Sequence, residues 1–164
     1  MEPNSTGQVR EFSWAWKGKP ISVVYEVWGT GHPIVMFPAL SSVSSRGEMR
    51  QLAALLAEQF QVWMVDWPGF GESDRPAIAY KPAFYHGFLR DFTRANFSDP
   101  VVAIAAGHGA GYVMQLAHQE PKPWSYVILL APTWRGPLPT MMGPKKWLFK
   151  LVRQAVELPI LGQI

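Results

Sequence analysis

The chain has 164 residues, of which 48% are hydrophobic and 16% charged, and its formal net charge is +3. This size and composition predict one globular domain and argue against disorder, and the absence of cysteine excludes disulfides and thiolate metal sites. The mild charge argues against nucleic-acid binding, no apolar run is long enough to span a bilayer, and the polar N-terminus does not resemble a secretory signal. We therefore expect a cytoplasmic protein with neither a metal nor another cofactor.

The first quarter of the chain predicts a β-hairpin followed by a buried strand. Residues 1–9 are polar and are expected to be flexible. Apolar residues alternate over 10–16, a short turn follows, and residues 21–28 form a second apolar segment. Two strands with so short a link indicate an antiparallel hairpin. Residues 33–38 predict a third, buried strand that leads into a serine-rich loop.

Strands and helices alternate in the middle of the chain. We predict a helix over residues 46–59, a strand over 61–66 and a second helix over 82–96. A further buried strand begins at Val101, and residues 124–130 predict another. Alternation of this kind indicates an α/β fold in which a mostly parallel sheet of about six strands carries helices on both faces.

A glycine-rich turn follows the strand that begins at Val101. It reads Gly107-His108-Gly109-Ala110-Gly111 and leads directly into a segment with helical spacing. Strand, sharp turn and helix are the frame of a nucleophile elbow, Gly-x-Ser-x-Gly, and in this frame Gly109 stands where the serine belongs. A phosphate loop would need a Lys-Ser/Thr pair, and a dinucleotide fingerprint would need a different glycine spacing. A generic tight turn between strand and helix is the remaining alternative.

The C-terminal segment differs in composition from the rest of the chain. Residues 135–144 are rich in proline and glycine and predict a linker. Residues 145–157 predict a basic amphipathic helix, with Trp147, Leu148 and Leu151 on its apolar face. Such a helix could contact a membrane surface or a protein partner.

A second motif makes the elbow interpretation specific. Residues 66–76 read Asp-Trp-Pro-Gly-Phe-Gly-Glu-Ser-Asp-Arg-Pro and follow a predicted strand. With the elbow, this loop resembles the N-terminal half of the α/β-hydrolase superfamily, above all the branch that holds haloalkane dehalogenases, epoxide hydrolases and lipophilic-ester hydrolases. The resemblance covers residues 10–134 as an incomplete hydrolase core. It implies that residues 135–164 are a linker and the start of a helical cap.

The resemblance also implies roles for individual residues. Gly109 takes the nucleophile position without a nucleophile, and the backbone N–H groups of Leu40 and Ala110 form the oxyanion hole. The family's His-Gly-x-Gly loop reads Pro38-Ala39-Leu40-Ser41 in this chain, which puts the geometry of that hole in doubt. The rest of the elbow consists of Gly107, His108 and Gly111.

Other candidate residues have simpler structural explanations. His108 adjoins the nucleophile position, but a packing role is expected for it. Asp66 is a possible carboxylate nucleophile, although its Pro-Gly context favours anchoring of the loop. The serines of the loop before residue 46 are expected to cap a helix. His32 and His86 lack metal-ligand spacing, and no strand-end loop after the elbow supplies a triad acid or histidine.

Two functions follow from the absence of a nucleophile and of a base. The first is a truncated α/β-hydrolase that is inactive as written and derives from enzymes hydrolysing an ester or similar bond in an apolar small molecule. The second is a pseudo-hydrolase that binds a small apolar ligand or a protein. An active enzyme completed by another chain is a weaker third possibility. The strand over residues 124–130 would form an exposed sheet edge, through which the chain could self-associate.

Overall fold

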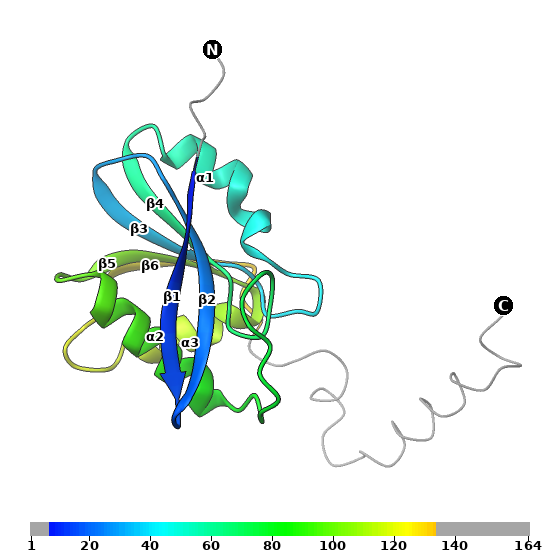
Figure 1. Cartoon of the computed structure of the whole chain (residues 1–164). Coiled ribbons are helices and arrows are strands. Elements are labelled where there is room, and N and C mark those ends of the chain that lie inside the picture. Colours follow the sequence, from blue (N-terminus) through cyan, green and yellow to red (C-terminus); the bar gives the residue numbers. More distant parts are fainter. Residues whose placement is uncertain (1–6, 134–164) are drawn as a thin grey trace, which may run out of the picture. The chain divides into compact units, whose positions relative to one another are not determined.

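A computed structural model describes residues 7–133, which form one six-stranded mixed sheet with helices on both faces (Figure 1). The strand order is β1-β2-β4-β3-β5-β6. β1 and β2 form an antiparallel hairpin, β2 runs antiparallel to β4, and the remaining pairs are parallel. The elements are β1 (Gln8–Trp16), β2 (Lys19–Trp28), β3 (His32–Phe37), the 3₁₀ turn η1 (Arg46–Met49), α1 (Arg50–Leu56), β4 (Phe60–Val65), α2 (Pro82–Asn96), β5 (Val101–Ala106), α3 (Gly107–Leu116) and β6 (Trp124–Leu130). The predicted α/β fold is confirmed.

The hairpin is longer than the alternating pattern predicted. Gln8 already pairs with Val27, so β1 begins inside the segment that was expected to be flexible. The two strands are joined by Lys17 and Gly18, whose φ angles are 50° and 79°. Positive φ at both central residues is the conformation of a type I′ turn, and its twist matches that of the flanking strands. This geometry places the side chains of the turn at one end of the sheet.

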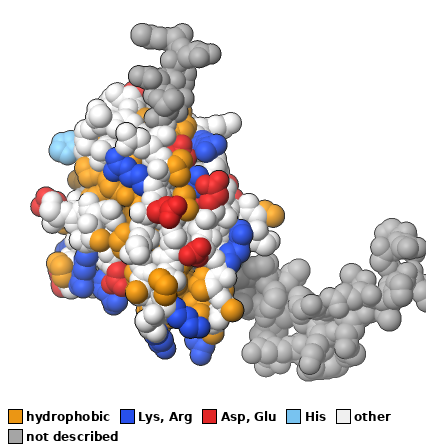
Figure 2. Space-filling view, viewed as in Figure 1, with side chains coloured by type: hydrophobic (Ala, Val, Ile, Leu, Met, Phe, Trp, Pro, Cys, Tyr) orange, Lys and Arg blue, Asp and Glu red, His pale blue; other side chains and the backbone are white. Residues whose placement is uncertain are grey.

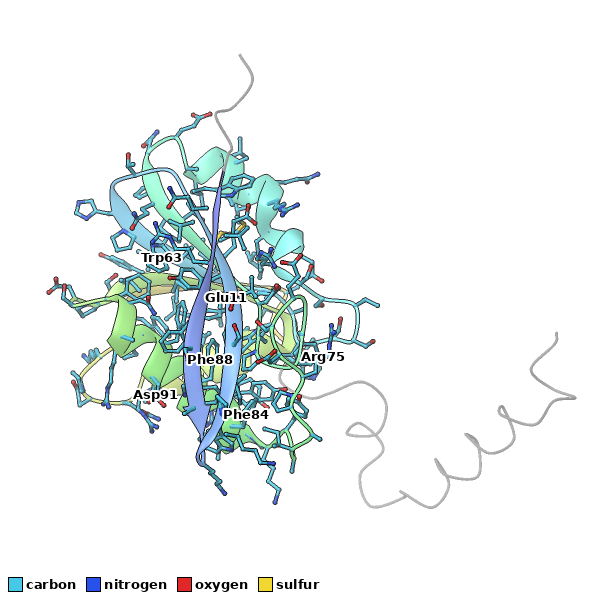
Figure 3. The ribbon with its side chains drawn as sticks, viewed as in Figure 1. Glu11, Trp63, Arg75, Phe84, Phe88 and Asp91 are labelled. Atoms are coloured by element: carbon cyan, nitrogen blue, oxygen red, sulfur yellow. The ribbon has the colours of Figure 1, made fainter. Side chains whose placement is uncertain are left out.

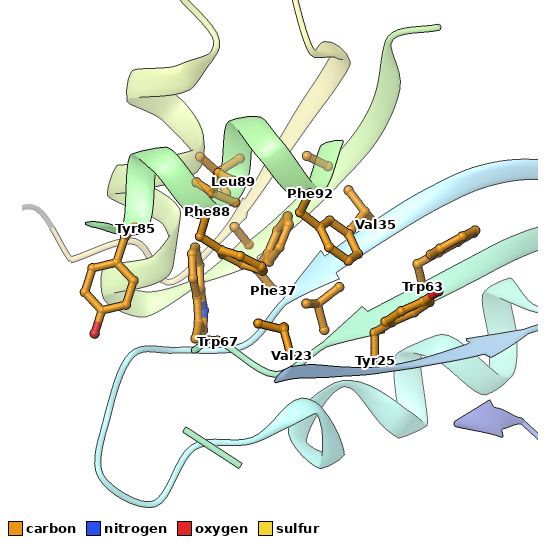
Figure 4. Packing of buried hydrophobic residues seen from close by; sticks show 14 of the residues in the cluster. Val23, Tyr25, Val35, Phe37, Trp63, Trp67, Tyr85, Phe88, Leu89 and Phe92 are labelled. Atoms are coloured by element: carbon orange, nitrogen blue, oxygen red, sulfur yellow. The ribbon is translucent and has the colours of Figure 1, made fainter. Parts of the chain in front are cut away.

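Helices α2 and α3 cover one face of the sheet through a core of aromatic side chains. Phe84, Phe88 and Phe92 of α2 are fully or almost fully buried, and Phe88 packs 5.5 Å from Trp14 between ring centroids (Figures 3 and 4). Trp67 lies between α2 and β3, with its ring 5.0 Å from that of Phe37. The helix predicted over 82–96 is confirmed, and its buried face is the one that carries these aromatic residues.

Helix α1 covers the opposite face over a smaller core. Met49 and Ala53 pack there against residues of β3, β4 and β5. The predicted helix over 46–59 consists of two shorter elements. The 3₁₀ turn η1 occupies its first residues, and α1 follows and ends at Leu56. Ser45 caps η1 by accepting a hydrogen bond from the N–H of Gly47 at 3.3 Å, which agrees with the expected capping role of the serine loop.

Strand β6 lies at one edge of the sheet. Within residues 7–133 its only pairing partner is β5. Tyr126 and Ile128 are 73% and 47% exposed, although both belong to an apolar strand. An edge strand with exposed apolar side chains offers unpaired backbone groups to other chains. The predicted linker and cap segment, 135–164, lies outside the described residues.

The described part of the chain contains neither a candidate membrane span nor a candidate metal site. Between residues 7 and 133, no helix is both long and apolar enough to cross a bilayer. In the same range, no group of three His, Cys, Asp or Glu side chains is placed to hold a metal ion. The cytoplasmic location stays a prediction.

Candidate active site

The loop after β4 is anchored by Asp66, which is completely buried. Its carboxylate accepts hydrogen bonds from the backbone N–H of Arg46 at 2.6 Å and from the N–H of Glu72 at 3.0 Å, and it pairs with the Arg46 guanidinium. Gly71 has φ 55°, and a Cβ at this position would overlap the Asp66 carboxylate. All the bonds of Asp66 thus hold the loop in place, and no face of the carboxylate is open to a substrate.

Arg46 connects this loop to the hairpin through a charge network in which Arg46 and Glu26 are buried and Glu72 is largely exposed. Its guanidinium contacts Glu26 at 3.4 Å and Glu72 at 2.6 Å. Burial opposes ionisation of Glu26, but hydrogen bonds from Trp28 and Arg50 and the nearby arginine charges hold its pKa below the ordinary value. Burial likewise opposes the charge of Arg46, yet its acidic partners raise the pKa of this side chain. The network fixes the loop at the carboxyl end of β4.

The sharp turn between β5 and α3 is made by Gly107. Its φ is 51°, a left-handed conformation that side chains other than glycine adopt at a cost, and α3 begins at this residue. A Cβ on Gly107 would lie 2.9 Å from the methyl carbon of Ala39, in the loop after β3. Gly107 is therefore the residue that forms the strand-to-helix turn and also lies against the β3 loop.

Gly109, the predicted turn residue, lies inside α3. It is buried and does not adopt a positive φ. A Cβ here would be 2.7 Å from the carbonyl oxygen of Pro38 and 3.0 Å from Cζ2 of Trp67. The left-handed backbone of the turn is thus not at Gly109: glycine is needed there because the helix passes directly over the end of β3. A Cβ on Gly111, by contrast, would have no such neighbour within 4 Å.

The residue at which α3 begins also determines which backbone N–H groups are free to bind a ligand. The first N–H groups of a helix lack acceptors within it, while the N–H of the fourth residue bonds to the cap carbonyl. With Ala106 as the cap and Gly107 as the first residue, that fourth residue is Ala110. Its N–H is used by the helix, whereas those of Gly107 and His108 are not. Leu40 is half-buried and packs against the aromatic core.

His108 contacts the segment that follows β6. Its Nδ1 lies 3.0 Å from the hydroxyl oxygen of Thr133, and the backbone N–H of Thr133 donates to the carbonyl of Gly107 at 3.1 Å. The imidazole is partly exposed. Both bonds tie the chain after β6 to the elbow, in keeping with the packing role expected for this histidine.

The remaining histidines are dispersed. His32 is the first residue of β3 and lies at the end of that strand away from the elbow. His118 follows α3 on the surface. His86, on α2, packs with its ring centroid 5.2 Å from that of Tyr112. Burial lowers the pKa of His86, a hydrogen bond with Gln115 acts in the opposite direction, and its Nε2 has no partner among the described residues.

Four residues of the site were given no role by the sequence. Pro38 and Ala39 close the β3 loop over the elbow, and Trp67 donates from Nε1 to the Pro38 carbonyl at 2.8 Å. Tyr112 adds a further aromatic ring 6.2 Å from Trp67. The one indication in the sequence was that Pro-Ala stands in that loop where the family has His-Gly. The effect of this replacement depends on how close the loop lies to Gly107, and no local sequence pattern gives that distance.

Comparison with known proteins agrees with this geometry. The sequence model described as "alpha/beta hydrolase fold" matches residues 32–158. Uncharacterised proteins of Mycobacterium tuberculosis and Mycobacterium bovis are 28% identical over 107 residues, which are 65% of this chain and 31% of theirs. The chain thus spans about a third of the length of these relatives.

Solved structures with the same fold include enzymes. A haloalkane dehalogenase from Agrobacterium tumefaciens matches with a TM-score of 0.68 and 20% identity, over 94% of this chain and 50% of that one. A probable hydrolytic enzyme from Pseudomonas aeruginosa matches with a TM-score of 0.72 and 17% identity, over 93% of this chain and 54% of that one. Given the family match over most of its length, this chain belongs to the α/β-hydrolase fold family.

Proposed function

We propose that this chain keeps the elbow and loop framework of an α/β-hydrolase but does not catalyse nucleophilic hydrolysis. The observation that carries the proposal is the pair of glycines at the elbow, Gly107 and Gly109, neither of which offers an attacking atom. The sequence motif assigns the nucleophile position to Gly109, whereas the backbone turn assigns it to Gly107. The proposal holds for either assignment, because both residues are glycine. We place the family's nucleophile position at Gly107, since the positive φ lies there.

The packing around both glycines supports this proposal. A side chain at Gly107 would meet Ala39, and one at Gly109 would meet Pro38 and Trp67. Neighbouring residues therefore occupy the space that a nucleophilic side chain would need. For this reason, a single substitution of either glycine would not restore the site. The ancestral activity we infer is hydrolysis of an ester or a similar bond in an apolar small molecule.

The positions of the candidate bases support the same conclusion. His108 is the histidine next to the turn, and its Nδ1 contacts Thr133. His86 lies under Tyr112, where burial lowers the pKa of the imidazole. A triad histidine must reach both the nucleophile and an acidic partner. Neither residue has a carboxylate within hydrogen-bonding distance among the described residues.

A second candidate function is binding of a small apolar ligand at the elbow. The N–H groups of Gly107 and His108 have no acceptor within α3, and the half-buried side chains of Leu40 and Tyr112 add apolar surface nearby. Free N–H groups at a helix start donate hydrogen bonds to a carbonyl oxygen or an anion. A neutral ester would then be bound without being hydrolysed.

Hydrolysis of p-nitrophenyl butyrate by the purified chain tests the first proposal. We expect no saturable rate above that of the heat-denatured protein, either for the natural sequence or for Gly109→Ser and Gly107→Ser. Saturable turnover by the natural sequence that is lost in His108→Ala would contradict the proposal, because it would make this histidine a nucleophile or base.

Titration with ethyl butyrate, followed by amide NMR, tests the second candidate. Binding at the elbow should shift the amide signals of Gly107 and His108 and leave those of Gly18 in the hairpin turn unchanged. The absence of saturable shifts at the elbow would rule out this ligand-binding role.

A further inference from the structure

A concave site separate from the elbow lies beside the closed end of the β1–β2 hairpin. It is a cavity of about 400 Å³, formed by the hairpin turn, the loop before α2 and the first turn of that helix. Its apolar walls come mainly from Trp16, Ile78 and Phe84, and Figure 3 labels Phe84 next to this end of the hairpin. The volume falls within the range of about 300–1,000 Å³ that small-molecule sites in proteins occupy. None of the elbow residues lines it.

The aromatic wall of this cavity is held by its neighbours. The ring of Trp16 lies against Gly87 of α2, where a Cβ would be 2.6 Å from Cζ3 of the indole. Phe84 packs edge-on against the same indole, with 5.7 Å between ring centroids, and Trp14 packs beside it at 5.7 Å. Contacts on several sides fix the orientation of Trp16, so the apolar surface exists before any ligand arrives.

The rim of the cavity carries charges of one sign. Lys17 and Lys19 flank the hairpin turn, and Lys81 precedes α2, so three ammonium groups border the apolar walls. Lys17 Nζ lies 5.8 Å from the centroid of the Trp16 ring, a distance typical of cation–π contacts. No acidic side chain lines the cavity. In Figure 2, blue and orange side chains lie next to each other at this end of the molecule.

We propose that this cavity binds a single-chain anionic amphiphile, a long-chain carboxylate, with its alkyl chain against Trp16 and Phe84 and its carboxylate among the lysines. The apolar walls favour burial of the chain, and the uncompensated positive rim favours the negative head. A cationic amphiphile of equal chain length gains the same apolar contact but is repelled by the rim. A short carboxylate has the charge without the chain.

Calorimetric titration with dodecanoate below its micelle concentration tests the proposal, with dodecyltrimethylammonium and acetate as comparison ligands. Dodecanoate should bind at one site, and each comparison ligand should bind at least about tenfold more weakly. Equal binding of dodecanoate and dodecyltrimethylammonium would overturn the proposal, because it would show adsorption to apolar surface alone.

A rim variant with a matched control locates the site. The change Lys17→Asn, Lys19→Gln, Lys81→Gln removes the three charges, and asparagine suits the left-handed conformation at position 17. Dodecanoate affinity should fall about tenfold in this variant and stay unchanged in Lys122→Gln, an exposed lysine away from the cavity. An equal loss in both, or no loss in the rim variant with its melting temperature preserved, would refute the site.

Vesicles distinguish this occupant from a membrane surface. Under conditions in which dodecanoate binds, any sedimentation of the natural sequence with phosphatidylglycerol vesicles should be unchanged in the rim variant. Sedimentation that depends on the three lysines, without binding of monomeric dodecanoate, would overturn the proposal in favour of a lipid-surface contact. The elbow variants test a different part of the molecule, so this inference and the proposed function fail separately.

Discussion

The methyl group of Ala39 fills the space that a side chain at Gly107 would need. A Cβ on Gly107 would lie 2.9 Å from that methyl carbon, closer than two such carbons pack. Glycine at the elbow and alanine in the β3 loop are therefore complementary. The next substitutions test this relationship through stability, which can be measured whether or not the protein has a ligand.

We expect Gly107→Ala to destabilise the protein through two separable effects. The left-handed conformation costs an alanine roughly 1–2 kcal/mol, and overlap with Ala39 adds about 1–3 kcal/mol. Gly18→Ala is the matched control, because Gly18 has φ 79° but nothing within 4 Å of its Cβ position. Urea unfolding of both variants measures the difference.

A double-mutant cycle with Ala39→Gly isolates the steric part. Removing the Ala39 methyl should recover most of the overlap cost in Gly107→Ala, giving a coupling free energy of about 1–3 kcal/mol. Additive effects of the two substitutions would show that Ala39 does not fill the space next to Gly107.

Gly109 and Gly111 form a second matched pair within α3. Gly109→Ala should cost about 1–3 kcal/mol in unfolding free energy, because its methyl group would displace the Pro38 carbonyl or Trp67. Gly111→Ala meets open space and should be neutral or stabilising by up to about 1 kcal/mol. Equal effects of the two changes would refute the close approach of the helix to the end of β3.

Much of this fold follows from the sequence, whereas the register of the elbow does not. The apolar run over 124–130 located β6, and the helical spacing of apolar residues over 82–96 located α2, whose buried side chains form one continuous face. The glycines at 107, 109 and 111 are spaced by two, so the elbow motif fits centred on Gly109 or, with small Ala105 in its first position, on Gly107. Only the φ angle and the contact with Ala39 separate the two frames.

The hairpin cavity was unpredictable for a related reason. Its walls join Trp16 to Phe84, which are far apart in sequence and meet because α2 packs across the hairpin. The alternating pattern showed that Trp16 would be half-buried. It contained no information on which helix would cover it.

Glu26 should make folding stability depend on pH. Its pKa in the folded state lies below the ordinary value of 4.5, so the stability it contributes is present above that pH and is lost as the pH falls through the folded-state pKa. The difference in unfolding free energy between the natural sequence and Glu26→Gln should be larger at pH 7 than at pH 3.5. Glu72→Gln, at a largely exposed carboxylate, should have a smaller effect. A difference that does not change with pH would exclude this role for Glu26.

The exposed edge strand β6 should promote self-association. We expect sedimentation velocity at micromolar concentration to show oligomers of the full chain, and Tyr126→Lys with Ile128→Lys to shift them toward monomer, because charges on an edge oppose strand pairing. Val43→Lys, at a loop residue that is 89% exposed, is the control and should leave the distribution unchanged. A monomeric natural chain would contradict this prediction.

Intact-protein mass spectrometry after exposure to a fluorophosphonate is the most direct test of whether the elbow carries a nucleophile. This reagent forms a covalent bond with an activated serine and leaves unactivated hydroxyl groups unmodified. We predict an unchanged mass for the natural sequence after prolonged incubation, because the elbow holds Gly107 and Gly109. A stoichiometric adduct would contradict it, and the modified residue would be the nucleophile whose absence we infer.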